Sequence, residues 1–190
     1  ADTDMTRINA DFLLMENHMS MFNLTDTLIQ NGYRRFAFAG DPGHCRSFSE
    51  RYQGFTHALS ANQLEPCSTQ FTGRSVFSDS QALEETVNRT LQLPEVFVCA
   101  NDATAVNLIR ALKKFGINIP DDVLITGFDN STKSRIIDPR LTTVDIPSSK
   151  MGYIAADMML SRINEPDMPY RIMHVRTTLK FRASTGKIKF

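Results

Sequence analysis

Residues 96–129 contain two short apolar runs that each end in polar residues and are joined by one helical segment. The first run, residues 96–100, is followed by Asn101, and the second, residues 123–126, leads to Asp129. Apolar runs alternating with an amphipathic helix predict neighbouring parallel strands. Asn101 and Asp129 would then lie just beyond the carboxyl ends of two strands. Open α/β sheets bind ligands at that edge, so this stretch predicts a binding site.

The same alternation of strands and helices extends along most of the chain. It predicts an α/β fold whose parallel strands are linked by right-handed crossovers. After Asp129 the pattern changes to a β-rich segment, a helix that begins at Ser148 or Ser149, and a stretch of alternating polarity. We expect strands at 12–15, 35–40, 69–71, 96–100, 123–126, 141–144 and 172–181, and helices at 22–30, 47–60, 80–91, 102–115 and 149–163.

Composition narrows the class of protein. With 21 basic and 21 acidic residues and no basic block, the chain itself has no electrostatic footprint for nucleic acid. No apolar run approaches the roughly 18 residues that a membrane helix needs. The three scattered cysteines suggest a reducing compartment, and the N-terminus lacks the pattern of a signal peptide. These features predict a cytoplasmic protein without membrane contact.

Catalytic and metal-binding patterns are missing from the sequence. It contains no Gly-x-Ser-x-Gly elbow, no phosphate-binding Gly-x-x-x-x-Gly-Lys loop and no His-Glu-x-x-His motif. The four histidines have no evident metal partners, and Asp121-Asp122 has the composition of a solvated turn. We therefore expect neither an enzyme nor a bound metal or cofactor.

Four polar residues are expected at the edge of the predicted sheet. Asn101 and Asp129 follow strands, and Ser47 and Arg51 lie on the helix after a third strand. An amide, a carboxylate, a hydroxyl and a guanidinium together can bind a polyol or another small polar ligand. The alternative is structural: Asn101 caps the helix that follows it, and Arg51 pairs with Glu50 or Asp129. The pattern alone leaves both interpretations open.

Six motifs together resemble the effector-binding region of the LacI/GalR family of bacterial transcription regulators. They occur in the family's order and spacing and cover most of the chain. The motifs are GYRRFAFAG (32–40), SERYQGF (49–55), VCANDATA (98–105), GINIPDDV (116–123), TGFD (126–129) and PRLTTV (139–144).

The resemblance assigns roles to individual residues of the C-terminal part of the site. Arg51 matches the family's effector-binding arginine, and Asn101 matches its sugar-contacting asparagine. Asp129 matches the carboxylate that ends the Gly-aromatic-Asp motif, and Ser47 matches a polar position that contacts the ligand.

Three further positions follow from the resemblance. Phe71 loosely matches the aromatic residue that stacks on the ligand, and Asp4 resembles an acidic residue that faces the ligand from the other lobe. Ile146 stands where many sugar-responsive members have Gln, which removes a two-way hydrogen-bonding group. The resemblance therefore predicts a small polar, carbohydrate-like effector and leaves its identity open.

The resemblance also implies an architecture, a periplasmic-binding-protein-like type I fold with one complete lobe and one partial lobe. Residues 17–146 and 173–190 would form the C-terminal lobe, and residues 1–16 and 147–172 the remainder of the N-terminal lobe. The family works as homodimers, and the apolar pair Ile136-Ile137 is a candidate contact or else local packing. Operator DNA would bind only through a headpiece that this chain lacks. The alternative is a solute-binding protein of a sugar transporter, which would carry a signal peptide upstream.

Overall fold

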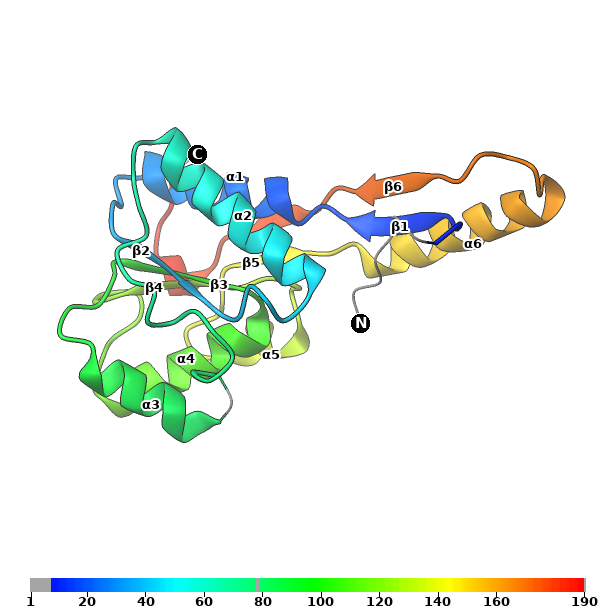
Figure 1. Cartoon of the computed structure of the whole chain (residues 1–190). Coiled ribbons are helices and arrows are strands. Elements are labelled where there is room, and N and C mark those ends of the chain that lie inside the picture. Colours follow the sequence, from blue (N-terminus) through cyan, green and yellow to red (C-terminus); the bar gives the residue numbers. More distant parts are fainter. Residues whose placement is uncertain (1–7, 78, 190) are drawn as a thin grey trace.

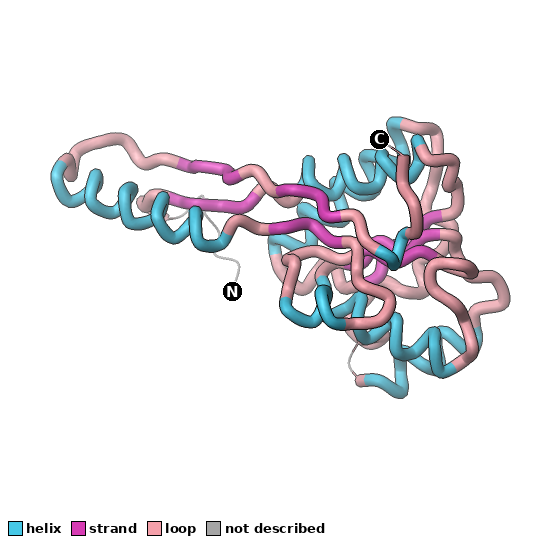
Figure 2. The backbone as a smooth tube through the Cα atoms, turned by 180° about the vertical axis from the view of Figure 1, so that it is seen from behind, coloured by secondary structure: helices cyan, strands magenta, loops and turns pink. Residues whose placement is uncertain are grey.

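Figure 1 shows the computed structural model, which describes residues 8–77 and 79–189. These residues form two connected regions. We call the larger region the body; it contains helices α1 to α5 and the central sheet. The smaller region, the arm, consists of β1 (Phe12–Met15), β6 (Ile172–Val175) and α6 (Ser148–Asn164). In Figure 2 the arm extends from one end of the body, and several chain segments run between the two.

The body is built on three parallel strands in the order β2-β3-β4. These are β2 (Phe36–Ala39), β3 (Val96–Cys99) and β4 (Leu124–Thr126). Phe36 pairs with Val96, and Val96 pairs with Leu124, so the strands run in register. Every residue of the three strands is buried, which explains why each strand reads as a continuous apolar run.

Helices cover both faces of this sheet (Figure 1). On one face lie α1 (His18–Gln30) and α2 (Arg46–Ala61), whose apolar residues pack with Phe36 and Phe38. On the other face lie α3 (Ser80–Arg89) and α4 (Asp102–Lys114), which pack with Phe97 and Cys99. Adjacent strand residues therefore serve opposite cores, as the strand period of two requires.

Four short elements that follow β4 in the chain complete the body. The short helix α5 (Thr132–Ile136) follows the turn after β4. Strand β5 (Thr143–Asp145) pairs antiparallel with β7 (Thr178–Lys180), and a 3-10 helix, η2 (Ala183–Thr185), follows.

The arm is a two-stranded parallel sheet covered by one helix. β1 pairs with β6, and the carboxylate of Asp11 joins this pair to α6 by accepting hydrogen bonds from Arg162 and Arg171. Many apolar side chains of the arm are exposed: Tyr153, Met159, Leu160, Ile163, Tyr170, Ile172 and Met173.

The structure corrects three expectations about individual elements. Helix α1 begins at His18, four residues earlier than expected, and residues 69–71 form no strand. Only isolated bridges, such as Gly40 with Thr72, connect that segment to β2. The stretch 172–181 is two strands instead of one, because β6 pairs in the arm and β7 pairs in the body.

Candidate functional site

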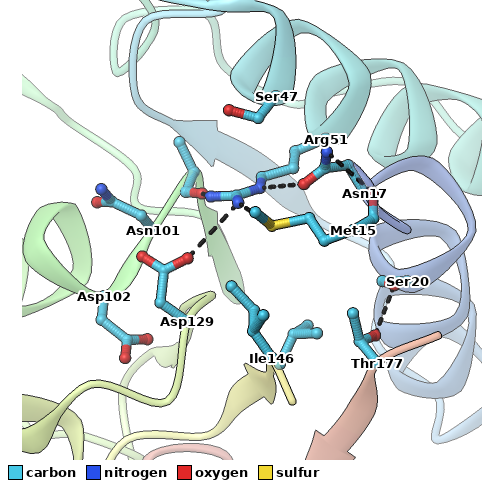
Figure 3. A network of polar contacts seen from close by, with 12 residues as sticks. Met15, Asn17, Ser20, Ser47, Arg51, Asn101, Asp102, Asp129, Ile146 and Thr177 are labelled. Carbon is cyan, nitrogen blue, oxygen red and sulfur yellow. Dashed lines mark hydrogen bonds and ion pairs between the residues drawn. The ribbon is translucent and has the colours of Figure 1, made fainter. Parts of the chain in front are cut away.

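Polar side chains converge beyond the carboxyl ends of β3 and β4 (Figure 3). Asn101 lies two residues after the end of β3, and Asp129 lies in the turn after β4. Arg51 extends toward them from α2. Ser47 lies one turn earlier on α2 and faces the same space in Figure 3. The structure thus brings together the four polar residues that the sequence predicts.

Arg51 is the most constrained member of this group, since only 3% of the residue is exposed. Its Nη1 donates to the carbonyl oxygen of Ala100 at 2.8 Å, and its Nε donates to Oδ1 of Asn17 at 3.0 Å. The guanidinium lies 3.7 Å from the centroid of the Phe128 ring, a cation–π contact. Burial lowers the pKa of Arg51, but an arginine side chain remains cationic in proteins.

Asp129 is the carboxylate partner of Arg51, with Oδ1 at 3.5 Å from Nη2. Its side chain is 37% exposed, so one side of the carboxylate faces open space. Burial raises the pKa of Asp129 to about 6; the Arg51 charge opposes this rise and the Asp102 charge adds to it. At neutral pH the group is therefore an ionised acceptor that Arg51 compensates only in part.

Asn101 realises the structural alternative. Its side-chain Oδ1 accepts a hydrogen bond from the Thr104 amide at 2.9 Å and so caps α4. The capping bond uses the oxygen and leaves the amide nitrogen as a donor, on a side chain that extends away from Arg51 and Asp129 in Figure 3. Capping and ligand contact are thus compatible at this position. The Ser47 hydroxyl lies 3.1 Å from the Cys45 sulfur.

Phe71 does not line the site, which corrects the expectation of a stacking aromatic there. The residue is fully buried, and its ring packs edge-on against Phe97 at 4.7 Å. The half-buried rings of Phe48 and Phe77 instead border a cleft of about 460 Å³. Its other lining residues are Gly40, Asp41, His44, Arg74 and Thr104.

The two remaining predicted positions differ in what the structure says about them. Asp4 lies outside the described residues. Ile146 is partly buried, packs against the core formed by α1 and α2, and points toward the space beside Asp129 (Figure 3).

Several residues of the site were not predicted from the sequence. Asn17 holds Arg51 and also donates to Glu50 Oε2 at 2.9 Å, while Met15 contributes its sulfur at 3.5 Å from Arg51 Nη2. Phe128 lies within the TGFD motif, so its position next to Asp129 was a usable signal. Asn17 gave no such signal, because it is 34 residues away from Arg51 in the sequence.

Residues 8–77 and 79–189 contain neither a metal-binding cluster nor a membrane-spanning helix. No cluster of three or more His, Cys, Asp or Glu side chains in these ranges is arranged to hold a metal ion. None of the helices described there has the length and apolar character needed to cross a bilayer.

Most of the chain matches a known domain family and several curated proteins. Residues 25–185 match the family model described as a periplasmic binding protein-like domain. The HTH-type transcriptional repressor PurR of Histophilus somni is 28% identical over 179 residues, which are 93% of this chain and 53% of that protein. The chain spans about half the length of the curated relatives it matches.

Two solved structures share the fold. A LacI-type transcription regulator from Bifidobacterium animalis subsp. lactis superposes with a TM-score of 0.79 at 28% identity, covering 92% of this chain and 67% of that one. The transcriptional regulator CelR in complex with cellobiose superposes with a TM-score of 0.81 at 26% identity, covering 93% and 54%.

Proposed function

This chain belongs to the periplasmic-binding-protein-like domain family, in the form found in LacI-type regulators, and we propose that it is the ligand-sensing part of a transcription regulator. The observation that carries the proposal is the Arg51–Asp129 pair at the carboxyl edge of the sheet. It sets a half-exposed carboxylate against a buried cation. The exposed side of that carboxylate can accept hydrogen bonds from a ligand.

The proposed effector is a small polar, carbohydrate-like molecule. A sugar ring has hydroxyl groups at its edge and an apolar face. The Asp129 carboxylate and the Asn101 amide can bond the hydroxyls. Phe48, whose ring centroid lies 5.6 Å from the Arg51 guanidinium, is the aromatic ring that the structure places near this group. A cellobiose complex of a structural relative supports this class of ligand. Ser47 and Ile146 complete the proposed contacts of the C-terminal lobe.

The architecture suggests how binding is reported. We assign the body to one lobe and the arm to the remainder of the other, with the ligand between them. This moves residues 173–175, which the sequence analysis gave to the C-terminal lobe, to the arm, because β6 pairs with β1. The chain passes between the lobes near Glu16-Asn17 and Ile146-Pro147, and also near Arg176-Thr177. A ligand changes the angle between lobes only if it binds one arrangement more tightly than the other.

The proposed assembly is a cytoplasmic homodimer that contacts operator DNA through a headpiece outside this chain. Ile136 supports a surface contact, because 76% of this large apolar residue is exposed on α5. Ile137 packs partly against the core. A solute-binding protein of a transporter is the alternative, and the regulators among the relatives favour the first reading.

Calorimetry with Asp129→Ala tests the ligand site. The probes are cellobiose, ribose and glucose, first screened by thermal shift because binding raises apparent stability. We expect a sugar that binds the native chain to show no measurable binding to the variant, with an unchanged far-UV spectrum. Asp121→Ala removes an exposed carboxylate before β4 and serves as the matched control. Equal affinity of the Asp129 variant and the native chain would refute the site.

A gel shift tests the assignment of DNA contact to a separate headpiece. The 190-residue chain has a formal net charge of zero and no basic block. We expect no sequence-specific shift with any promoter fragment. A specific shift would overturn this part of the proposal.

A further inference from the structure

The turn that carries Asp129 has an unusual backbone. Asp129 has φ 112° and Asn130 has φ 50°, so two consecutive non-glycine residues adopt positive φ values. Residues other than glycine rarely adopt such values and persist there only when surrounding contacts hold them. The contacts that hold this turn therefore decide where the Asp129 carboxylate points.

One side of the turn is held through Thr143 on β5. The Asn130 amide donates to the Thr143 hydroxyl at 3.2 Å, and the Asp129 amide donates to the Val144 carbonyl at 2.9 Å. The same Thr143 hydroxyl donates to Oδ1 of Asp102 at 2.6 Å. Because the hydroxyl proton is directed to Asp102, an oxygen lone pair remains to accept the Asn130 amide.

Asp102 also contacts the end of the turn directly. Its Oδ2 accepts a hydrogen bond from the Ser131 amide at 2.7 Å, and its own amide donates to the Phe128 carbonyl at 2.8 Å. The residue is 1% exposed, so its carboxylate does not contact a ligand. Asp102 thus bonds to the residues immediately before and after the Asp129–Asn130 pair.

The packing around Asp102 leaves it little freedom. Gly127 lies against it, and a Cβ added at Gly127 would collide with the Asp102 carboxylate. Asp102 is also the first residue of α4, where the helix dipole favours a negative charge. The Asp102 carboxylate is therefore a fixed hydrogen-bond acceptor in contact with the turn.

We propose that Asp102 is a positioning residue of the ligand site, acting through Thr143 and Ser131 to hold the turn that presents Asp129. This role rests on the ligand-binding function proposed above. It assigns to the second residue of the Asn-Asp pair a task distinct from that of Asn101, which caps α4 and is itself a proposed ligand contact.

The first test changes Thr143, since Thr143→Val keeps the shape of the side chain and removes both hydrogen bonds. We expect cellobiose, or whichever of the three screened sugars binds, to bind roughly tenfold to a hundredfold more weakly. Thr143→Ser keeps the hydroxyl and should restore affinity to within about threefold. Thr25→Val is the matched control, because the buried Thr25 hydroxyl has no hydrogen-bond partner within the described residues.

The second test needs no ligand and follows the Asp129 carboxyl by ¹³C NMR titration. Five charged groups contact the turn or lie next to it. They are Arg51 on α2, Asp102 on α4, Arg135 on α5, Asp145 on β5 and Arg182 after β7. The Asp129 pKa of about 6 should fall in Asp102→Asn, which removes a negative charge. It should also fall in Thr143→Val, because a released turn is better solvated.

The two tests separate the proposals. If no sugar binds the native chain but Thr143→Val, which removes no charge, lowers the Asp129 pKa, the effector assignment fails and the positioning role stands. If sugar binds and neither affinity nor the Asp129 pKa changes in Thr143→Val and Asp102→Asn, the positioning role is overturned.

Discussion

The body and the arm bury their apolar residues very differently. All residues of β2, β3 and β4 are buried between two layers of helices. In the arm, β6 has two exposed apolar residues, Ile172 and Met173, and α6 exposes Leu160 among others. The body is therefore stabilised by apolar burial, whereas the arm depends more on its polar contacts.

Their carboxylates differ in the same way. In the arm, Asp11 accepts hydrogen bonds from Arg162 and Arg171, and these hold its pKa well below the usual range. In the body, burial outweighs Arg51 and raises the pKa of Asp129. One carboxylate is fully used in holding the fold together. The other keeps unused capacity to accept hydrogen bonds, which is what a binding site requires.

The largest expected effect is the difference in stability lost when an apolar residue is removed from the body or from the arm. Phe97→Ala removes a fully buried ring from the sheet of the body and should lower the free energy of unfolding by about 3–5 kcal/mol. Leu160→Ala, on the exposed face of the arm, should change it by less than about 0.5 kcal/mol. Urea denaturation of both variants measures the difference. Similar losses in the two variants would show that the arm also has a protected core.

An intermediate effect is expected for Asp11→Asn. The change removes the charge that joins β1 to α6, so the arm should open while the body stays intact. Hydrogen exchange should be roughly tenfold faster at Phe12, whose amide bonds the Arg171 carbonyl, and unchanged in β3.

The pH dependence of this contact has a definite sign. Because the folded-state pKa of Asp11 lies below the ordinary 3.8, its contribution is present above that pH and is lost as the pH falls further. Exchange at Phe12 that stays slow in the variant would contradict this role of Asp11.

The smallest effect concerns Asp129. Its pKa of about 6 exceeds the ordinary 3.8, so between these values the folded chain holds a proton that the unfolded chain has released. The free energy of unfolding should therefore fall as the pH rises from about 4 to 6 and level off above. Since the side chain is 37% exposed, the fall should be below about 1 kcal/mol.

Asp129→Asn provides the comparison for this pH profile. The variant should lack the fall, which urea denaturation at pH 4.5 and 7.5 can detect. An identical pH profile for the two chains would show that Asp129 titrates normally.

Sequence patterns predicted the central sheet because each of its strands is a continuous apolar run between helices. They also brought Arg51, Asn101 and Asp129 together, since the carboxyl ends of parallel strands share one edge. Phe71 was misplaced because its match to the family's stacking aromatic was loose, and the residue is fully buried in the core.

Contacts between residues far apart in the chain could not be predicted from sequence patterns. Alternating polarity over residues 172–181 does not reveal that the strand changes partners between Val175 and Thr178. The contact between Thr143 and Asp102 likewise joins residues 41 positions apart. Such contacts depend on the packed fold and leave no local periodicity.

Three chain segments join the arm to the body, at Glu16-Asn17, Ile146-Pro147 and Arg176-Thr177 (Figure 2). Strand pairing links the three segments to one another, because β1 pairs with β6 and β5 pairs with β7. Because the three segments are linked in this way, a displacement of one is transmitted to the other two. Asn17 lies in the first of these segments and accepts a hydrogen bond from Arg51 Nε. A single hydrogen bond therefore connects this junction of arm and body to the guanidinium of the site.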